Sequence, residues 1–342
     1  MDIIKKCFKL NKLTNIYLSK KLLNKFPKKL RLTKYKQIKS TKIDFKYLEN
    51  DFTSKNVANN IKKRCNYQVV LQNNYRTIKI IGNNSEIPYI KKIIKDIDMI
   101  LNFFDDLLGM KNNYNLYFYL SDLKKKIDKK NKVIGIDEIN SGLTSVGIVS
   151  VLFRKEEVVK VFIHELIHYL KLDIYDLQDK IKFIFDDINL DNKLLNPNEA
   201  YTEYLAIIIL CYFQYLKSKT KMSRDEFMSK RLLVELQWSF YQIAKILDFF
   251  KCYNSYEDLF TKKCKFRQRT SVLSYFILKA YFLFYSDKFM DCINFDSIEN
   301  RFNCVRKINL QDKKFGNCVN ILLNFYRGKF DNCMRMSFPF SN

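Results

Sequence analysis

The spacing of apolar residues first predicts a small β-sheet in the amino-terminal half of the chain. Two runs rich in β-branched residues, 67–71 and 75–81, flank Asn73-Asn74 and predict a β-hairpin. Short apolar runs at 115–120 and 147–153 predict two further strands. We therefore expect one small mixed sheet in this part of the chain.

Apolar residues recur at helical spacing over most of the remaining chain. Ser85 is expected to cap the first long helix, which should end at Gly109 and lie across the sheet. The fold class that follows is α+β and mostly α-helical, with a helical carboxyl-terminal region. The expected helices span 87–108, 154–171, 197–217, 223–251, 270–285 and 315–327.

These changes along the chain divide it into three predicted parts. Residues 1–64 are a basic amino-terminal arm or helical extension. Residues 65–171 contain the small sheet and the helices up to a His motif described below, and residues 172–342 form a helical subdomain. With only 7 Gly and 4 Pro in 342 residues, low-complexity linkers are excluded.

Positive charge is concentrated at the amino-terminal end. Residues 1–64 hold 19 Lys or Arg against 4 Asp or Glu, a net charge of +15 out of +25 for the whole chain. Such a surface attracts polyanions through its long-range field, without identifying which one. A contact between the basic arm and nucleic acid is therefore one expectation, and ordinary solvation of a Lys-rich surface is the alternative.

The nine Cys and the apolar runs bear on where the protein resides. The number of Cys is odd and no Cys-x-x-Cys pair occurs, which is typical of a reducing compartment. The first residues contain no apolar stretch of signal-peptide length, so secretion is not expected. The longest apolar runs fall well short of the roughly 20 residues that a bilayer span needs, and we expect no membrane span.

The chain contains two His, and both lie in His164-Glu165-Leu166-Ile167-His168. Residues four apart share one face of a helix, so both imidazoles can bind one Zn²⁺ at about 2.0 to 2.1 Å. Glu165 lies about 100° around the helix from His164, where it can reach a metal-bound water. We therefore predict a zinc site with Glu165 as general base. A pair of partly buried His without metal is the alternative, although their apolar surroundings make it costly.

A catalytic zinc site keeps three protein ligands and one open position, so a third ligand is needed. No His remains, and Lys171 and Ile174 stand where the metzincin motif requires Gly and His. Glu199 and Glu203 share one face of the helix expected after Pro197. One carboxylate can bind the metal while the other accepts a hydrogen bond from a ligand imidazole. A solvated acidic stripe is the alternative.

The two motifs together resemble the gluzincin branch of zinc metallopeptidases, and this resemblance implies that Glu199 is the third ligand and Glu203 its supporting carboxylate. Between about residues 139 and 212 the chain is also similar to zincin-like metallopeptidases of large nucleocytoplasmic DNA viruses. A zincin-like sheet with a zinc-site helix is implied. The segments that carry the likeness are Asn140-Ser141-Gly142-Leu143-Thr144, Phe153-Arg154-Lys155-Glu156-Glu157, the His motif and Glu199-Ala200-Tyr201-Thr202-Glu203-Tyr204.

The resemblance also implies a reaction, which is zinc-dependent hydrolysis of a peptide or protein substrate. Zinc would lower the pKa of its water to about 7, and Glu165 would pass the proton to the leaving amine. The strand expected at 147–153 resembles the sheet-edge strand that pairs with extended substrate in zincins. Gluzincins often stabilise the oxyanion with a further His or a Tyr. Since no third His exists, a Tyr or an Arg is expected to serve here, with no means of choosing among 22 Tyr.

Two other functions fit parts of the sequence. A catalytically inactive zincin-fold protein, for instance a virion component, would retain zinc without turnover, although a structural zinc has no use for Glu165 and usually has four protein ligands. A basic nucleic-acid-binding protein would bind polyanions in a salt-sensitive way, but the sequence holds no recognised nucleic-acid motif. Whichever of the three functions applies, the expected location is the cytoplasm of an infected host cell or the virion.

Overall fold

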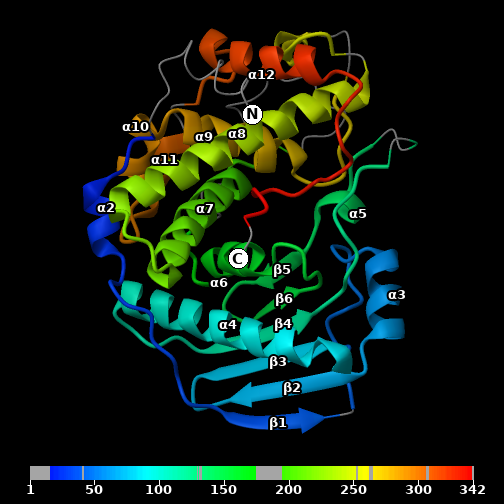
Figure 1. The fold of residues 1–342 in the computed structure, drawn as a ribbon, viewed down its shortest axis with the longest axis vertical. Helices are drawn as coiled ribbons and strands as arrows, with labels where there is room; N and C mark the ends of the chain where they lie inside the picture. The colour runs from blue at the N-terminus through cyan, green and yellow to red at the C-terminus, as the bar shows by residue number, and fades with distance from the viewer. Residues whose placement is uncertain are drawn as a thin grey trace.

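The computed structural model describes residues 16–340 apart from 41, 129, 131–132, 175–194, 252, 262–264 and 306–307. A mixed sheet lies at one end of the molecule and helices occupy the rest (Figure 1). The expected fold class, α+β and mostly helical with a helical carboxyl-terminal region, is confirmed. In the described part of the chain, no helix combines the length and the apolar character that a membrane span requires.

The sheet has the strand order β1-β2-β3-β4-β6-β5. β1, β2 and β3 pair antiparallel, β3, β4 and β6 are parallel neighbours, and β5 pairs antiparallel with β6. The predicted hairpin at Asn73-Asn74 is confirmed, because the Asn73 N–H donates to the Arg76 carbonyl at 3.0 Å. The strands are β1 (Lys36–Ser40), β2 (Tyr67–Gln72), β3 (Arg76–Gly82), β4 (Tyr114–Tyr119), β5 (Gly142–Ser145) and β6 (Val149–Leu152).

The prediction that the strand within 147–153 forms the sheet edge is wrong. β6 lies between β4 and β5, with Ser150 opposite Leu116 on one side and Thr144 on the other. The strand at this edge of the sheet is β5, which follows directly on the turn-like residues 140–141. Its sequence, Gly-Leu-Thr-Ser, contains a single apolar residue and gives almost no strand signal.

Helix α4 (Ile87–Leu108) has the bounds that the sequence predicts and connects β3 to the parallel strand β4. Gly109 ends it in the left-handed conformation at φ +65°, as Gly does at many helix ends. The expected capping role of Ser85 is wrong. Ser85 lies inside a short 3₁₀ turn, η1 (Asn84–Glu86), where its N–H donates to the side-chain oxygen of Asn83.

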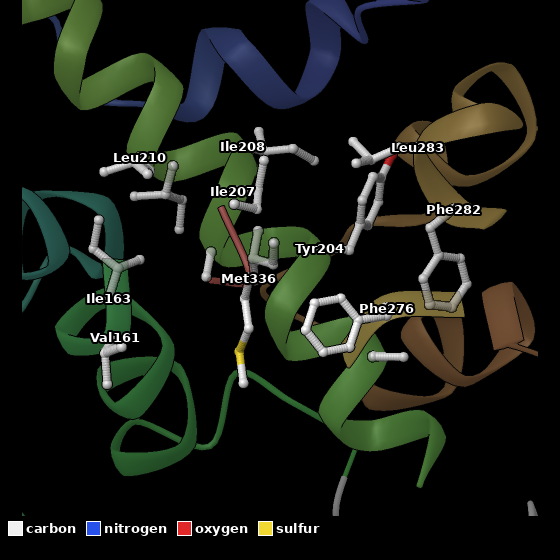
Figure 2. Close-up of a cluster of buried hydrophobic side chains, with 14 of the residues drawn as sticks. Val161, Ile163, Tyr204, Ile207, Ile208, Leu210, Phe276, Phe282, Leu283 and Met336 are labelled. Carbon is white, nitrogen blue, oxygen red and sulfur yellow. The ribbon is translucent and has the colours of Figure 1, made fainter. Parts of the chain in front are cut away.

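Helices α6 (Val158–Tyr169) and α7 (Pro197–Lys217) pack against each other and carry the candidate site. α8 (Arg224–Phe250) packs against α7 and, on its other side, against α12 (Lys313–Tyr326). Apolar side chains of α6, α7 and the segments 274–284 and 331–340 meet in one cluster (Figure 2). The remaining helical elements are α5 (Ile136–Ile139), η4 (Tyr256–Phe260), the π-helix η5 (Ser274–Leu278), α9 (Lys279–Phe284), α10 (Ser286–Phe289), η6 (Met290–Cys292) and α11 (Ile298–Val305).

The described part of the predicted arm, residues 16–64 without residue 41, is folded against the rest of the protein. Helix α2 (Lys20–Lys25) buries two Leu in the main core, and β1 belongs to the sheet. Helix α3 (Lys55–Arg64) packs over the opposite face of the sheet and closes a second, smaller core. The apolar residues spaced along this Lys-rich stretch account for its packing.

Candidate metal centre

Helix α6 carries both His, and the way it ends brings a further carboxylate beside them. Lys171 adopts a left-handed conformation at φ +55°, and the Leu172 N–H donates back to the Ile167 carbonyl at 2.9 Å. This reversal stops the helix and returns the chain toward His168. Arg301 fixes the returning segment, because its guanidinium donates to the Asp173 carbonyl at 3.0 Å.

Three side-chain atoms from α6 and α7 converge on one point. His164 Nε2 lies 3.1 Å from His168 Nε2 and 3.2 Å from Glu199 Oε2, and His168 Nε2 lies 3.6 Å from the same Glu199 oxygen. A tetrahedral zinc with bonds of about 2.0 to 2.1 Å holds its ligand atoms about 3.3 Å apart. The triangle therefore has the size that this metal needs, and its three residues form a group that could hold a metal ion.

The other nitrogen of each imidazole is held by a carboxylate. His164 Nδ1 lies 3.0 Å from Glu203 Oε2, and His168 Nδ1 lies 2.6 Å from Asp173 Oδ2. Asn198, next to Glu199 on α7, donates to the same Asp173 oxygen at 3.3 Å. Carboxylates in these positions fix the tautomer and the orientation of metal-ligating His, so the second nitrogens are arranged as in a metal site.

The charges at the centre are strongly coupled. Burial alone would lower the pKa of His168, but the Glu199 and Asp173 carboxylates outweigh it and raise that pKa well above its ordinary value. Burial would raise the pKa of Glu199, yet the neighbouring His168 and His164 hold it well below the usual range. For Glu203, the Lys160 ammonium overcomes burial and lowers the pKa to about 2. The Glu199 and Glu203 carboxylates are thus held ionised, as a metal ligand and its support must be.

Glu165 faces the opposite side of the centre, toward the edge strand β5. The Thr144 hydroxyl donates to Glu165 Oε2 at 2.7 Å, and burial raises the pKa of this carboxyl. Gly142, two residues earlier on the same face of β5, leaves the space that the carboxylate occupies. A Cβ at position 142 would lie 2.6 Å from Glu165 Oε1, so the close approach requires glycine.

Tyr275, in the π-helix η5, completes the surroundings of the centre. Its hydroxyl donates to Glu199 Oε2 at 2.9 Å, and its ring packs edge-on against His164 with centroids 6.0 Å apart. The oxygen of Glu199 that points at both imidazoles therefore also accepts a hydrogen bond from Tyr275. The sequence offered no way to select this Tyr, because no motif links residue 275 to the two helices.

A cleft of about 650 Å³ opens over the centre. Its walls include residues of β5, the loop 139–141, Val161 of α6 and Met336 from the carboxyl-terminal segment. Arg154 holds the loops that flank this wall, since its guanidinium donates to the backbone carbonyls of Asn140 at 2.9 Å and Leu123 at 3.2 Å. The Arg154 guanidinium donates to backbone carbonyls, so Arg154 acts as a support of the cleft wall.

The structure brings all of the residues selected from the sequence to this one place: His164, Glu165, His168, Glu199 and Glu203. Sequence reasoning missed Asp173, Tyr275 and Lys160. Asp173 was detectable only as one of several Asp after the zinc-motif helix. Lys160 stands one helical turn before His164, a spacing that places it on the same face, but an isolated Lys carries no metal-site signal.

Comparison with known proteins finds sequence similarity to a viral protein. It is 29% identical over 142 residues to the uncharacterized protein R210 of Acanthamoeba polyphaga mimivirus, a stretch that covers 41% of this chain and 35% of that protein. The matched stretch thus spans about a third of the relative's length. No protein-family model and no solved structure matches the chain.

Proposed function

We propose that this protein is a zinc-dependent metallopeptidase. The single observation that carries the proposal is the convergence of His164, His168 and Glu199 within 3.6 Å of one another, with Glu165 buried beside them. Two imidazoles and one carboxylate form a three-ligand set typical of catalytic zinc, which leaves one position open. The viral relative has no assigned activity, so the proposal rests on the site itself.

Zinc in this place would supply a Lewis acid, which lowers the pKa of a bound water and polarises a substrate carbonyl. Glu165 is the residue proposed to accept and return a proton during hydrolysis. Burial raises the pKa of Glu165 above its ordinary value, which makes its carboxylate a better proton acceptor, and the Thr144 hydroxyl holds the group in place. Glu165 makes no contact with the second nitrogen of either His, which separates it from the residues that orient the ligands.

Tyr275 is the residue proposed to stabilise negative charge on the substrate oxygen. Its hydroxyl lies beside the Glu199 carboxylate and is a donor on the wall of the cleft. Burial and the nearby Glu199 raise the pKa of Tyr275 well above its ordinary value, so the hydroxyl keeps its proton. A neutral phenol can donate to a developing oxyanion, as other side-chain donors do.

The free edge of β5 is the proposed substrate-binding element. In the described part of the chain, no strand pairs with the outer side of β5, and Gly142 to Ser145 line the cleft. An extended peptide can add to such an edge through main-chain hydrogen bonds. This arrangement would place the peptide along the cleft next to Glu165.

The test is a pair of measurements on one preparation. Elemental analysis should find about one zinc per chain, and a mixed peptide library should be hydrolysed. The Glu165→Gln variant should keep its zinc and its thermal stability and lose about 10²- to 10⁴-fold in hydrolysis rate.

Three outcomes would contradict parts of the proposal. Absence of metal from a folded sample prepared without chelators would remove the zinc site. Equal activity of the parent and of Glu165→Gln would assign hydrolysis to a contaminant or another site. A zinc-loaded parent inert to every peptide would favour a zincin-like scaffold without catalysis.

A further inference from the structure

A buried ion pair lies directly behind the candidate metal centre. The Lys160 ammonium donates to both oxygens of Glu203, at 2.7 and 2.8 Å, and the second of these oxygens also faces His164 Nδ1. The Glu203 side chain is fully buried and that of Lys160 is 3% exposed. A buried carboxylate that serves a metal ligand needs a partner of opposite charge, and Lys160 is that partner.

The carboxyl-terminal segment, residues 331–340, holds Lys160 from the other side. Met336 Sδ accepts a third hydrogen bond from the Lys160 ammonium at 3.3 Å. All three N–H donors of the ammonium are then used. Figure 2 shows the Met336 side chain in the space between α6, which carries Val161, and α7. Lys160 is therefore fixed between a helix and a segment that lies more than 170 residues later in the chain.

Met336 is itself held by its backbone. Its N–H donates to Glu157 Oε2 at 3.2 Å, and its carbonyl accepts from the Lys279 ammonium at 2.5 Å. The next residue, Ser337, donates from both its N–H and its hydroxyl to the other oxygen of Glu157, at 2.7 and 2.6 Å. Buried charged side chains thus hold the backbone of this segment through several hydrogen bonds. These contacts fix the position of the segment behind the metal centre.

We propose that Lys160 is a positioning residue of the metal centre, which orients Glu203 and through it the ligand His164, and that the carboxyl-terminal segment holds Lys160 in place. The inference rests on the proposed metal site but not on peptide hydrolysis. The Lys160 ammonium donates to both oxygens of Glu203, so this carboxylate cannot rotate away from His164. An imidazole with a fixed partner on one nitrogen presents the other nitrogen in a fixed direction.

Lys245 provides a matched control. Its ammonium is also buried and also holds the carboxyl-terminal segment, through the Asp331 carboxylate and the Cys333 carbonyl, both at 2.5 Å. No contact between Lys245 and Glu203 occurs among the described interactions. Replacement of Lys245, which lies on α8, therefore removes a buried charge that holds the same segment and leaves the pair behind His164 intact.

The experiment compares Lys160→Met and Lys245→Met in the full-length protein, with Co²⁺ and Zn²⁺ as probes. Lys160→Met should weaken Zn²⁺ binding by about 10- to 100-fold, the range found when support of a ligand is lost, and should alter the visible spectrum of bound Co²⁺. Lys245→Met should lower the melting temperature and leave both metal readouts as in the parent. Unchanged or tighter Zn²⁺ binding by folded Lys160→Met would overturn the proposal.

A double-mutant cycle separates positioning from general destabilisation. If Lys160 acts through Glu203, then Lys160→Met combined with Glu203→Gln should bind Zn²⁺ no more weakly than Glu203→Gln alone. Additive losses would overturn the proposal. Should Lys160→Met not fold, Lys160→Gln keeps one donor for Glu203, and the same cycle applies to it.

The metal readouts also keep this proposal distinct from the proposed function. A parent that binds no metal defeats the proposed zinc site and this inference together. A parent that binds metal but hydrolyses no peptide defeats only the proposed peptidase function, and the effect of Lys160 on metal binding is still expected.

Discussion

The two sides of the candidate centre are built in different ways. On the α7 side, Glu203 and its partner Lys160 from α6 are buried, and the Glu199 side chain is 19% exposed. Each of the three is paired, so the groups that would hold a metal are fixed by opposite charges. On the β5 side, Glu165 is held by one hydrogen bond from Thr144 and by the space over Gly142. Metal retention and proton transfer therefore depend on different parts of the fold.

This difference shows how one small site can separate metal retention from proton transfer. Ionised ligands need a rigid, charge-compensated environment, because a buried charge without a partner is costly. A general base needs a carboxyl group that can gain and lose a proton, and a fixed counter-charge would hold it ionised. In agreement, the pKa of Glu203 is lowered by Lys160, whereas burial raises the pKa of Glu165. Substitutions on the two sides should accordingly have separable effects.

The largest effect is expected on the α7 side. Glu199→Ala removes one of three ligands and should abolish Zn²⁺ retention, whereas Glu203→Ala removes only the support of His164 and should weaken binding by roughly 10- to 100-fold. Competition with a chromogenic chelator measures both affinities. If Glu203→Ala proved the more damaging change, the roles of ligand and support would be reversed.

The next effect concerns Tyr275, which lies between the two sides. Tyr275→Phe keeps the ring against His164 and removes only the hydroxyl, so Zn²⁺ content should remain close to one per chain. Removal of an oxyanion donor should lower kcat for peptide hydrolysis by about 10²-fold. Tyr201→Phe is a suitable control, because Tyr201 lies on α7 at 1% exposure and does not line the cleft. A full rate for Tyr275→Phe would assign charge stabilisation elsewhere.

Much of this fold was predictable from the sequence because its long elements carry strong periodic signals. The bounds of α4 and α7 agree with those predicted, since each helix has a clear start and stop and apolar residues throughout. β5 was missed because four residues with one apolar side chain carry no alternation. β1 was missed because it lies at the far edge of the sheet and is exposed over nearly its whole length. Short edge strands are defined by their neighbours, which a local pattern cannot contain.

The candidate site, like the fold, contains residues that the sequence could identify and residues that it could not. Residues that repeat at helical spacing, such as the two His and the two Glu of α7, could be selected from the sequence. Asp173 and Tyr275 could not, because each reaches the centre through tertiary structure: one by a left-handed reversal after α6, the other from a helix more than 70 residues beyond Glu199. Spacing therefore indicated the ligands and gave no information on most of the groups that surround them.

A smaller effect is expected from pH, through the His on the ligand side. Both His pKa values are raised in the metal-free protein, so protons compete with metal up to a higher pH than for an ordinary His. The contribution of His168 to metal-free stability is complete below about pH 6.5 and is lost as pH rises through the raised pKa. The increase in melting temperature on adding Zn²⁺ should therefore keep growing as pH rises above about 6.5, with affinity rising about tenfold per pH unit for each proton released.

Asp173→Asn tests the cause of this pH dependence. The variant loses a carboxylate that raises the pKa of His168, so the rise in Zn²⁺ affinity should begin at lower pH than in the parent. Scanning calorimetry with and without Zn²⁺ across the pH range gives both curves. Identical pH profiles for Asp173→Asn and the parent would show that another group controls proton competition.

The smallest effect is expected on the β5 side, where Glu165 is held by the Thr144 hydrogen bond and by the space over Gly142. Gly142→Ala would place a methyl group 2.6 Å from Glu165 Oε1, and the carboxylate must move to make room. Since efficient proton transfer requires close positioning, the hydrolysis rate should fall by about tenfold while Zn²⁺ content is retained. Gly135→Ala adds the same methyl group at a place where the nearest atom, Cβ of Arg269, is 3.6 Å away, so it should leave both measurements unchanged. Loss of Zn²⁺ from Gly142→Ala, with Gly135→Ala unaffected, would mean that the two sides of the centre are mechanically coupled after all.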